Sequence, residues 1–518
     1  MSQWGLWTIS ALGVALAAAG CGKGDGGCDA CVEIADTGDR TRRDAGADGG
    51  SSPDAAQPEV DGGDLPDLGP RDSGTHGEVT VGTRGHILIR GRAVLTMSAS
   101  VSYAPGELYV EGNRIRCVGA MGACQAEAAG ATVIETGGIV LPGLVDAHNH
   151  VAYDWLPIWN AGRIFDDSQA WRAAPDYDAF TQPYSDNKGD AAKFCAMVQW
   201  GEIRAMVHGT TTIYGTPQPR TCYRWLVRNA ELSTGYNGFA RDAVFSNTLG
   251  IDTVNMADAM SLVTRMQSGE ISAYLIHLSE GFTQRSHDEF VSLKMLNLLQ
   301  PQTVIIHGAA LTAADFAEVA AAQAKLVWSP SSNLQLYNRT TDVRAAKMAG
   351  VSIALAPDWT PSGSGSLLGE LGFTRELLDR TDPSLFTDEE LVKMATSIPA
   401  QMLGVPNLLG HLVVGQYADV LVIDRPELDP YAGVVRANAG DIRMVMIDGA
   451  PVFGDKSLLE LLPDAPPDIS DFEACGGQKR AAWPPTPDGT VSVNSIGTVI
   501  AGFYAPMAYP LVPTCPVR

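Results

Sequence analysis

The sequence predicts an α/β fold built around a (β/α)8 barrel. From residue 139 onward, short apolar runs typical of buried strands alternate with helical patterns over roughly 250 residues, the usual size of such a barrel. Hydrophobic residues make up 45% of the 518-residue chain and charged residues 18%. A chain of this composition can bury a large core, which excludes disorder of the whole protein.

The predicted barrel spans residues 144–405. Its apolar strand candidates are Ile139–Val145, Thr210–Tyr214, Phe239–Phe245, Ala273–His277, Val304–His307, Lys325–Trp328 and Ser352–Ala356. Helical patterns occur at Ala191–Val207, Tyr223–Glu231, Met256–Met266, Ala313–Ala324 and Asp342–Ala349. A barrel of this type needs one more strand than these candidates supply, and we expect it between residues 184 and 272.

The first 21 residues predict an export signal. Residues 1–20 carry no charged side chain, and the apolar or small run from Trp4 to Gly20 is shorter than the about 20 residues of a typical membrane-spanning helix. Its end, Ala18-Ala19-Gly20-Cys21, is similar to a bacterial lipobox, in which the cysteine is lipidated. We therefore expect an exported lipoprotein, anchored in a membrane through Cys21 on the periplasmic or cell-surface side. An ordinary signal peptide is the alternative.

The remaining segments differ from the barrel in composition. Residues 22–76 are rich in Asp and Gly and nearly free of aromatic residues, which predicts a disordered tether because they can bury little apolar surface. Residues 77–143 and 406–455 contain short β-type runs. Residues 456–518 are rich in Pro and Gly, and we expect them to form a C-terminal strap.

The charge balance excludes one class of partner. Lys and Arg number 36 against 59 Asp and Glu, a net charge of −23, whereas nucleic-acid binding needs clustered Lys and Arg. We expect a small-molecule substrate, no nucleic acid, and membrane contact through the lipid anchor only. The sequence leaves the oligomeric state open.

Potential metal ligands follow four of the predicted strands. His148 and His150 come directly after an apolar run, and residues i and i+2 of a strand point to the same side, so both imidazoles can reach one ion. His277, His307 and Asp358 each end or follow a further apolar run. Because barrel active sites form where the strands end, this pattern predicts a metal site at that rim.

Around these residues the chain resembles the amidohydrolase superfamily. The matching segments, which lie within residues 80–455, are Pro142–His150, Gly209–Thr212, His277–Gly281, His307–Gly308, Ser329–Asn333, Ala356–Gly363 and Gly415–Asp424. The resemblance implies a metal-dependent (β/α)8 barrel beside a small β-sandwich built from residues 77–143 and 406–455.

The pair formed by His277 and Glu280 is similar to one in the family's deaminases and chlorohydrolases, where the His binds metal and the Glu moves a proton. Family members with two metals bridge them through a carboxylated Lys, but no Lys occurs between Lys193 and Lys294. One divalent ion is therefore expected, with ligands His148, His150, His277 and Asp358. Zn²⁺ suits three His and one Asp, and Fe²⁺ is the alternative.

The expected activity is hydrolysis of a non-peptide carbon–nitrogen bond by a metal-activated water, with removal of an amino group as the main prediction. In this mechanism Asp358 accepts a proton from the water, Glu280 passes a proton to the leaving group, and His307 orients the group under attack. Ring opening of a cyclic amide or imidazolone is one alternative. A non-catalytic binding lipoprotein is another.

Two further sets of residues allow more than one interpretation. The aromatic residues Tyr153, Trp155, Trp159 and Trp171 either line a substrate pocket or pack a long loop. Export favours disulfides, and the expected pairs are Cys195–Cys222, Cys117–Cys124, Cys475–Cys515 and Cys28–Cys31.

Overall fold

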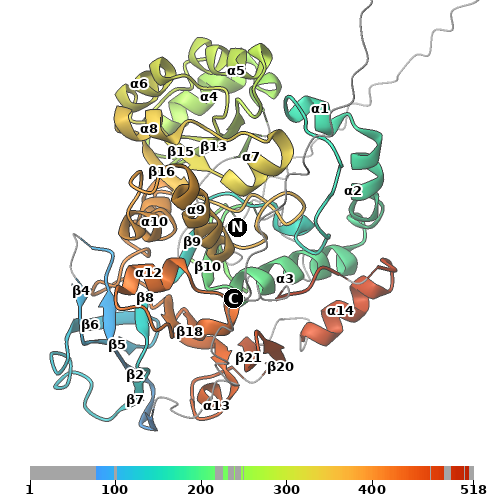
Figure 1. Cartoon of the computed structure of the whole chain (residues 1–518). Helices are drawn as coiled ribbons and strands as arrows, with labels where there is room; N and C mark the ends of the chain where they lie inside the picture. The colour runs from blue at the N-terminus through green and yellow to red at the C-terminus, as the bar shows by residue number, and fades with distance from the viewer. Residues whose placement is uncertain are drawn as a thin grey trace, which may run out of the picture. The chain divides into compact units, whose positions relative to one another are not determined.

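A computed structural model describes residues 78–98, 102–215, 226–231, 238–239, 247–248, 250–466, 468–483, 492–506 and 508–512 (Figure 1). The predicted signal segment with Cys21 and the predicted tether lie outside these residues. Among the helices that the structure describes, none is long and apolar enough to cross a membrane.

The described residues contain eight short parallel strands, and the potential metal ligands lie at or after the ends of four of them. They are β9 (Leu144–Asp146), β10 (Thr210–Ile213), β11 (Arg228–Asn229), β12 (Asn247–Thr248), β13 (Tyr274–Leu278), β14 (Thr303–His307), β15 (Lys325–Trp328) and β16 (Ser352–Leu355). They form two sheets, in the orders β11-β10-β9 and β12-β13-β14-β15-β16. A parallel bridge between Asn149 and Asp358 joins the end of β9 to the end of β16. No pairing between β11 and β12 is seen in the described residues, so these strands form two sheets there and not a closed barrel.

Two of these strands, β11 and β12, were not predicted from the sequence, and β11 corrects part of a predicted helix. The helix expected over Tyr223–Glu231 is wrong at Arg228 and Asn229, which are fully buried and pair with β10. The Arg228 guanidinium lies 2.7 Å from a carboxylate oxygen of Asp419, and the Asn229 amide donates to Glu202 at 2.7 Å. These distant partners make a buried polar strand stable, which local periodicity does not reveal.

Most other predicted elements of this region lie close to their expected places. Of the strand predicted over Phe239–Phe245, only Phe239 is described, and it lies outside any strand. The helices that accompany the strands are α3 (Ala191–Val207), α4 (Met256–Gln267), α5 (Gln284–Met295), α6 (Ala313–Ala321), α7 (Pro330–Tyr337), α8 (Val343–Ala349), α9 (Leu367–Thr381), α10 (Asp388–Met394) and α11 (Ser397–Met402), with a 3-10 turn at Ile251–Thr253. In Figure 1, α4, α5, α6 and α8 lie together over the β12–β16 sheet.

The segment between β9 and α3 is unusually long for a strand-to-helix connection. It forms a 3-10 turn (Val151–Tyr153), α1 (Ser168–Arg172) and α2 (Pro175–Asn187). The carboxylate of Asp167 caps α1 by accepting a hydrogen bond from the backbone of Ala170. Figure 1 shows α1 and α2 next to each other at the right of the view.

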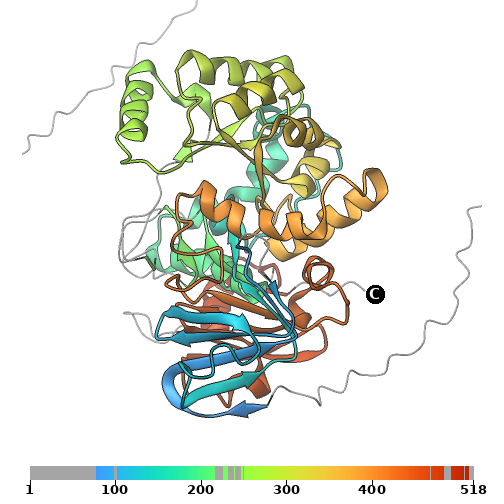
Figure 2. The same cartoon turned by 90° about the vertical axis from the view of Figure 1, so that its left-hand side faces the viewer.

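Segments before and after the parallel strands form two further sheets (Figure 2). The first has the order β1 (Val79–Thr80), β7 (Ala131–Glu135), β2 (Thr83–Gly91), β5 (Gly106–Glu111), β6 (Arg114–Ala120). The second has the order β20 (Asp468–Ala474), β21 (Gly477–Trp483), β19 (Ala450–Asp455), β18 (Ile442–Ile447), β17 (Val420–Ile423), β8 (Ile139–Pro142), β3 (Ala93–Leu95), β4 (Ser102–Tyr103). Ile89 and Leu108 from the first sheet and Val140 and Val420 from the second belong to one buried apolar cluster. Burial of this shared cluster holds the two sheets together.

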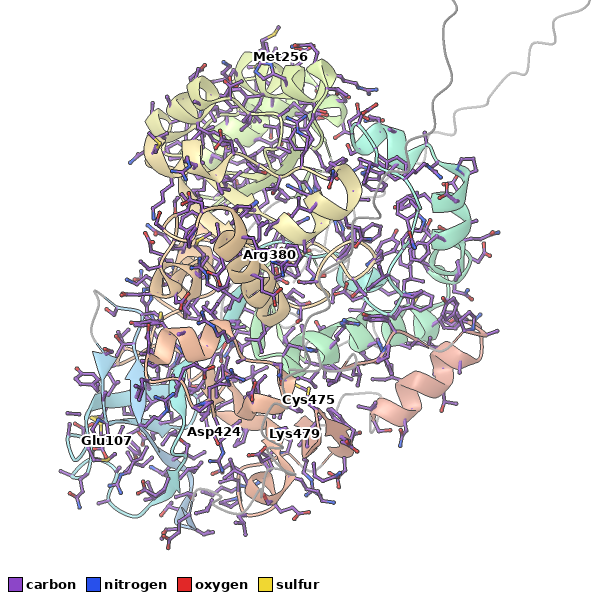
Figure 3. All side chains as sticks on the ribbon, in the orientation of Figure 1. Glu107, Met256, Arg380, Asp424, Cys475 and Lys479 are labelled. Atoms are coloured by element: carbon purple, nitrogen blue, oxygen red, sulfur yellow. A yellow bond between two sulfur atoms is a disulfide. The ribbon has the colours of Figure 1, made fainter. Side chains whose placement is uncertain are left out.

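The C-terminal region contributes a hairpin and a helix. Residues 456–518, expected as a strap, contain α13 (Lys456–Leu459), the β20–β21 hairpin and α14 (Val493–Ala501), while α12 (Pro430–Val435) and a 3-10 turn (Ala439–Asp441) precede β18. Lys479 anchors the hairpin: its buried ammonium donates to the carbonyl oxygens of Gly440 and Ile442 at 3.0 and 2.7 Å and pairs with Asp455 at 2.6 Å (Figure 3). A buried cation with three partners fixes the hairpin on β19.

One of the expected disulfides is confirmed. Cys117 and Cys124 are joined, with their Cα atoms 5.6 Å apart. Cys195 and Cys475 each take part in a disulfide as well. The partners expected for them, Cys222 and Cys515, lie outside the described residues, as does the expected pair Cys28–Cys31.

His208 makes the stability of the fold sensitive to acid. Its imidazole is buried after α3, with Nδ1 2.8 Å from the carbonyl oxygen of Arg204, and burial together with the positive charge of Arg204 lowers its pKa to about 4. Between pH 6.5 and 4, the unfolded chain therefore carries a proton on His208 that the folded chain does not, so the free energy of unfolding falls as the pH is lowered through this window.

We predict that His208→Gln flattens this dependence. Glutamine keeps a donor for the Arg204 carbonyl but does not titrate, so the variant should lose up to about 1.4 kcal/mol per pH unit of slope between pH 6.5 and 4. Urea unfolding of both proteins at half-unit pH steps measures the difference. Parallel curves would contradict the prediction.

Candidate active site

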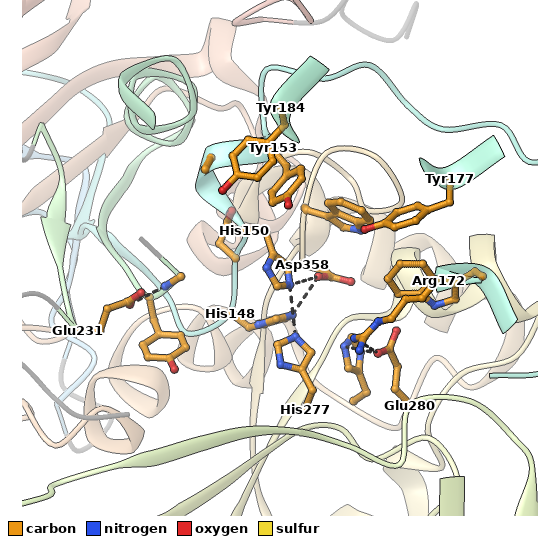
Figure 4. Close-up of a pocket in the computed structure, with 17 residues that line it drawn as sticks. His148, His150, Tyr153, Arg172, Tyr177, Tyr184, Glu231, His277, Glu280 and Asp358 are labelled. Carbon is orange, nitrogen blue, oxygen red and sulfur yellow. Dashed lines mark hydrogen bonds and ion pairs between the residues drawn. The ribbon is translucent and has the colours of Figure 1, made fainter. Parts of the chain in front are cut away.

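The ends of β9, β13, β14 and β16 bring the predicted site residues into one pocket (Figure 4). The pocket has a volume of about 570 Å³ and is lined by His148, His150, His277, Glu280, His307 and Asp358, among others. His307 and Asp358 both have a positive φ, of 70° and 68°. Such left-handed turns are rare outside glycine and concentrate at functional sites, and here they turn the chain sharply as each strand ends.

Three imidazoles and one carboxylate converge in this pocket. Nε2 of His148 lies 3.0 Å and Nε2 of His150 lies 3.5 Å from Oδ1 of Asp358, and Nε2 of His277 lies 3.3 Å from Nε2 of His150. The donor atoms of His148, His150 and His277 all lie within 4.8 Å of one another, as do those of His148, His307 and Asp358. The separations of 3.0, 3.5 and 3.3 Å suit ligand atoms that each lie about 2.0–2.2 Å from one zinc ion.

The contact between His150 and His277 fits a metal site in particular. Each neutral imidazole has one N–H and one lone pair, so this 3.3 Å contact is an N–H···N hydrogen bond in one pair of tautomers, and in the other both Nε2 lone pairs face inward and can bind a cation. The donor set of three nitrogens and one oxygen is one that divalent transition metals prefer.

Burial keeps the histidines in the form that metal binding requires. Burial lowers the pKa of His148, lowers that of His150 to about 3, and lowers that of His277 well below its usual value. Burial opposes ionisation of Asp358, but the charges of His148, His307 and His150 and the hydrogen bond to His148 together outweigh it, so the pKa of this carboxyl lies well below its usual range. The site therefore offers neutral imidazoles and an ionised carboxylate at neutral pH.

The second carboxylate oxygen of Asp358 is held by α7, the helix that follows β15. The hydroxyl of Ser332 donates to Oδ2 of Asp358 at 2.7 Å, and the backbone N–H of His150 donates to the Asp358 carbonyl at 3.1 Å. These contacts leave Oδ1 directed at His148 and His150. On the β9 side, Asp146 accepts the backbone N–H of His148 at 3.1 Å.

Glu280 lies buried beside this cluster, three residues after His277. Its Oε1 accepts a hydrogen bond of 2.7 Å from the hydroxyl of Tyr337, and its Oε2 lies 3.5 Å from the guanidinium of Arg172 and 3.9 Å from Nε2 of His307. The other imidazole nitrogen of His307 lies 3.3 Å from Oδ1 of Asn333. All predicted site residues in the described part of the chain thus meet in one place, and Cys21 lies outside that part.

Of the four aromatic residues that were expected either to line the pocket or to pack a long loop, two line the pocket and two do not. Tyr153 and Trp171 line the pocket. Trp155 is fully buried elsewhere, with its ring against Phe503 and Tyr504, and Trp159 packs in a neighbouring aromatic cluster.

Several pocket residues were not predicted from the sequence. Arg172, Tyr177, Tyr184, Glu231 and Trp359 line the pocket, and Tyr337 contacts Glu280 from α7. One signal was available for Tyr337, because it stands four residues after Asn333 on the same helix and therefore on the same face. Arg172, Tyr177 and Tyr184, which lie in α1 and α2, carry no such signal, because only the folded chain brings them over the strands.

Comparison with known proteins agrees with this geometry. Residues 245–452 match the amidohydrolase family. The chain is 25% identical over 419 residues to 5-methylthioadenosine/S-adenosylhomocysteine deaminase 1 of Syntrophus aciditrophicus, covering 72% of this chain and 93% of that protein.

Solved structures of similar fold include two zinc-containing hydrolases. An adenosine deaminase from Xanthomonas campestris with bound zinc aligns with a TM-score of 0.56 at 18% identity, covering 70% of this chain and 92% of that one. Atrazine chlorohydrolase from Arthrobacter aurescens in complex with zinc aligns with a TM-score of 0.57 at 18% identity, covering 71% and 95%. The match to the amidohydrolase family over residues 245–452, the similarity to deaminases and the His–Asp cluster together support a metal-dependent hydrolase that acts on carbon–nitrogen bonds other than peptide bonds.

Proposed function

We propose that the protein is an aminohydrolase that replaces an amino group on a flat heterocyclic ring with oxygen and releases ammonia. The convergence of His148, His150, His277 and Asp358 beside the buried carboxylate of Glu280 carries this proposal. The names of similar proteins, which include methylthioadenosine, adenosine and guanine deaminases, support it.

We propose that these four residues hold one Zn²⁺ ion, since three imidazoles and one carboxylate suit its tetrahedral preference. Fe²⁺ is the competing ion for the same donors. When bound, the ion supplies an activated water molecule at neutral pH. Similar folds that contain zinc support this choice.

The surrounding side chains divide the proton transfers between them. Asp358, held at Oδ2 by Ser332, accepts a proton at Oδ1 as the nucleophile forms its bond to carbon. Glu280 delivers a proton to the departing amino nitrogen, so that ammonia leaves as the carbon–nitrogen bond breaks, and the proton taken up by Asp358 then restores the one that Glu280 has given. His307, oriented through Asn333, presents Nε2 to the substrate group under attack.

The pocket walls suit an aromatic substrate. Rings of Trp171, Tyr177 and Trp359 gather over the cluster, with Tyr153 and Tyr184 completing the wall in Figure 4. Aromatic rings favour offset stacking or edge contacts with another ring, and a volume of about 570 Å³ is in the range of small-molecule sites.

Two features of the fold belong to the same proposal. We propose that the sheets β11-β10-β9 and β12–β16 are two arcs of one closed barrel, supported by the bridge between Asn149 and Asp358 at one seam. We propose also that the two outer sheets, which share one apolar cluster, form a β-sandwich beside it.

Metal analysis tests the cofactor. We expect purified protein to contain one zinc ion per chain and His277→Asn to lose it, because the variant removes a ligand nitrogen. His287→Asn is the matched control, since His287 pairs with Asp315 between α5 and α6, away from the cluster. Elemental analysis of both variants gives the answer, and protein without stoichiometric metal would favour the non-catalytic binding protein.

Product analysis tests the reaction. We expect ammonia from at least one of 5′-methylthioadenosine, adenosine and guanine, and we expect Glu280→Gln to keep its metal while turnover falls by about 10²–10⁴-fold, the usual contribution of a positioned proton carrier. Glu318→Gln, at a surface pair with Lys294, is the control. A product heavier by one water without ammonia would identify ring opening, and unchanged turnover in Glu280→Gln would remove Glu280 from the mechanism.

We propose further that the enzyme is exported and lipid-anchored through Cys21. The disulfides at Cys117–Cys124, Cys195 and Cys475 support export, because disulfides persist in oxidising compartments. We predict that cells expressing the full chain incorporate an alkyne fatty acid into it and that Cys21→Ser abolishes the label and releases the protein from membranes. Label retained in Cys21→Ser would contradict the prediction.

A further inference from the structure

The helix α1 is joined directly to the loop that carries Glu280. The backbone N–H of Ser168 donates to the Glu280 carbonyl at 3.1 Å, and that of Phe282 donates to Asp166 at 2.8 Å, so a short antiparallel bridge links Asp167 to Gly281. A side chain at position 281, where φ is +123°, would place its Cβ 2.4 Å from the Asp167 Cα. Glycine thus permits the close approach that sets α1 over Glu280.

From this position α1 supplies the first link of a hydrogen-bonded chain. The indole N–H of Trp171 donates to the hydroxyl oxygen of Tyr337 at 2.8 Å, and the Tyr337 hydroxyl donates to Oε1 of Glu280 at 2.7 Å. All three side chains are buried, with residue exposures of 6%, 3% and 4%. Water therefore does not compete for these bonds, and each is stronger than it would be at the surface.

The donors and acceptors of this hydrogen-bonded chain are fixed by the chemistry of its side chains. An indole N–H can only donate, so the Tyr337 oxygen must accept from Trp171, and the single hydroxyl hydrogen of Tyr337 is left for Glu280. Burial and the charge of Glu280 raise the pKa of Tyr337 well above its usual value, so the phenol keeps this hydrogen. Oε1 of Glu280 is thereby committed to an acceptor role.

We propose that Trp171 and Tyr337 are positioning residues that reserve Oε2 of Glu280 for proton exchange with the substrate. Oε2 is the oxygen on the side of His307 and Arg172, both of which line the pocket. Figure 4 shows Glu280 and Arg172 together at one side of the cluster. The proton that Glu280 carries then sits on Oε2, and the departing amino nitrogen receives it from there. This inference rests on the proposed role of Glu280.

Kinetics of matched variants test the proposal. Tyr337→Phe keeps the ring and removes the hydroxyl, and we expect kcat to fall about tenfold with KM within about twofold, because one hydrogen bond to a charged group is lost. Trp171→Phe should lower kcat by about threefold, and the double variant should match Tyr337→Phe alone, because Trp171 acts through Tyr337. Additive losses would overturn the proposal. Tyr109→Phe in β5, which removes a hydroxyl bonded to His86 of β2, is the control.

A spectroscopic measurement tests the hydrogen-bonded chain without measuring turnover. In protein labelled with [ζ-¹³C]tyrosine, the Tyr337 resonance is the one absent from Tyr337→Phe, and we expect it to shift in both Trp171→Phe and Glu280→Gln. An unshifted resonance would overturn the hydrogen-bonded chain. If Glu280→Gln retains turnover while the resonance shifts, the proton role of Glu280 fails and the chain stands. If Glu280→Gln is inactive and Tyr337→Phe is fully active, the positioning role alone fails.

Discussion

The carboxylate of Asp358 lies in a buried pocket against the imidazole nitrogens of His148 and His150, and the rest of the site is arranged around this contact. Burial suppresses protonation of the imidazoles, while their proximity keeps the carboxylate ionised. A negative charge surrounded by neutral nitrogen donors is costly in a protein interior unless a cation joins it. Binding of a cation at this point therefore stabilises the buried carboxylate, which is why this position suits a metal ion.

Geometry at the ends of the strands makes the contact feasible. The bridge between Asn149 and Asp358 joins the last parallel strand to the first, so His148 and Asp358, which are 210 residues apart in sequence, lie side by side. The left-handed turns at His307 and Asp358 direct the chain back as each strand ends. Ser332, from the neighbouring connection, then occupies the second carboxylate oxygen. Each oxygen of Asp358 thus has one set of partners.

Segments outside the matched family region brace the loops that carry these residues. Asp154 accepts the backbone N–H of Thr360, two residues after Asp358, and the guanidinium of Arg204 donates to the carbonyl oxygens of Gly365 and Pro510. Trp155 accepts the backbone N–H of Tyr509 through its carbonyl. The C-terminal segment is therefore bonded to the same framework that holds the loop after β16.

The sequence by itself determined the strand-end positions of His148, His150, His277, His307 and Asp358, because each follows an apolar run whose period and length are local properties. It did not determine β11, since Arg228 and Asn229 become a buried strand only through partners far away in the chain. For the same reason, the sequence did not predict Arg172 and Tyr337 as neighbours of Glu280, because these residues lie 108 and 57 positions away from it in the chain. The spacing of side chains along a strand is set by backbone geometry, which is local. The neighbours of a side chain in space depend on how distant segments pack, and only the tertiary structure contains that information.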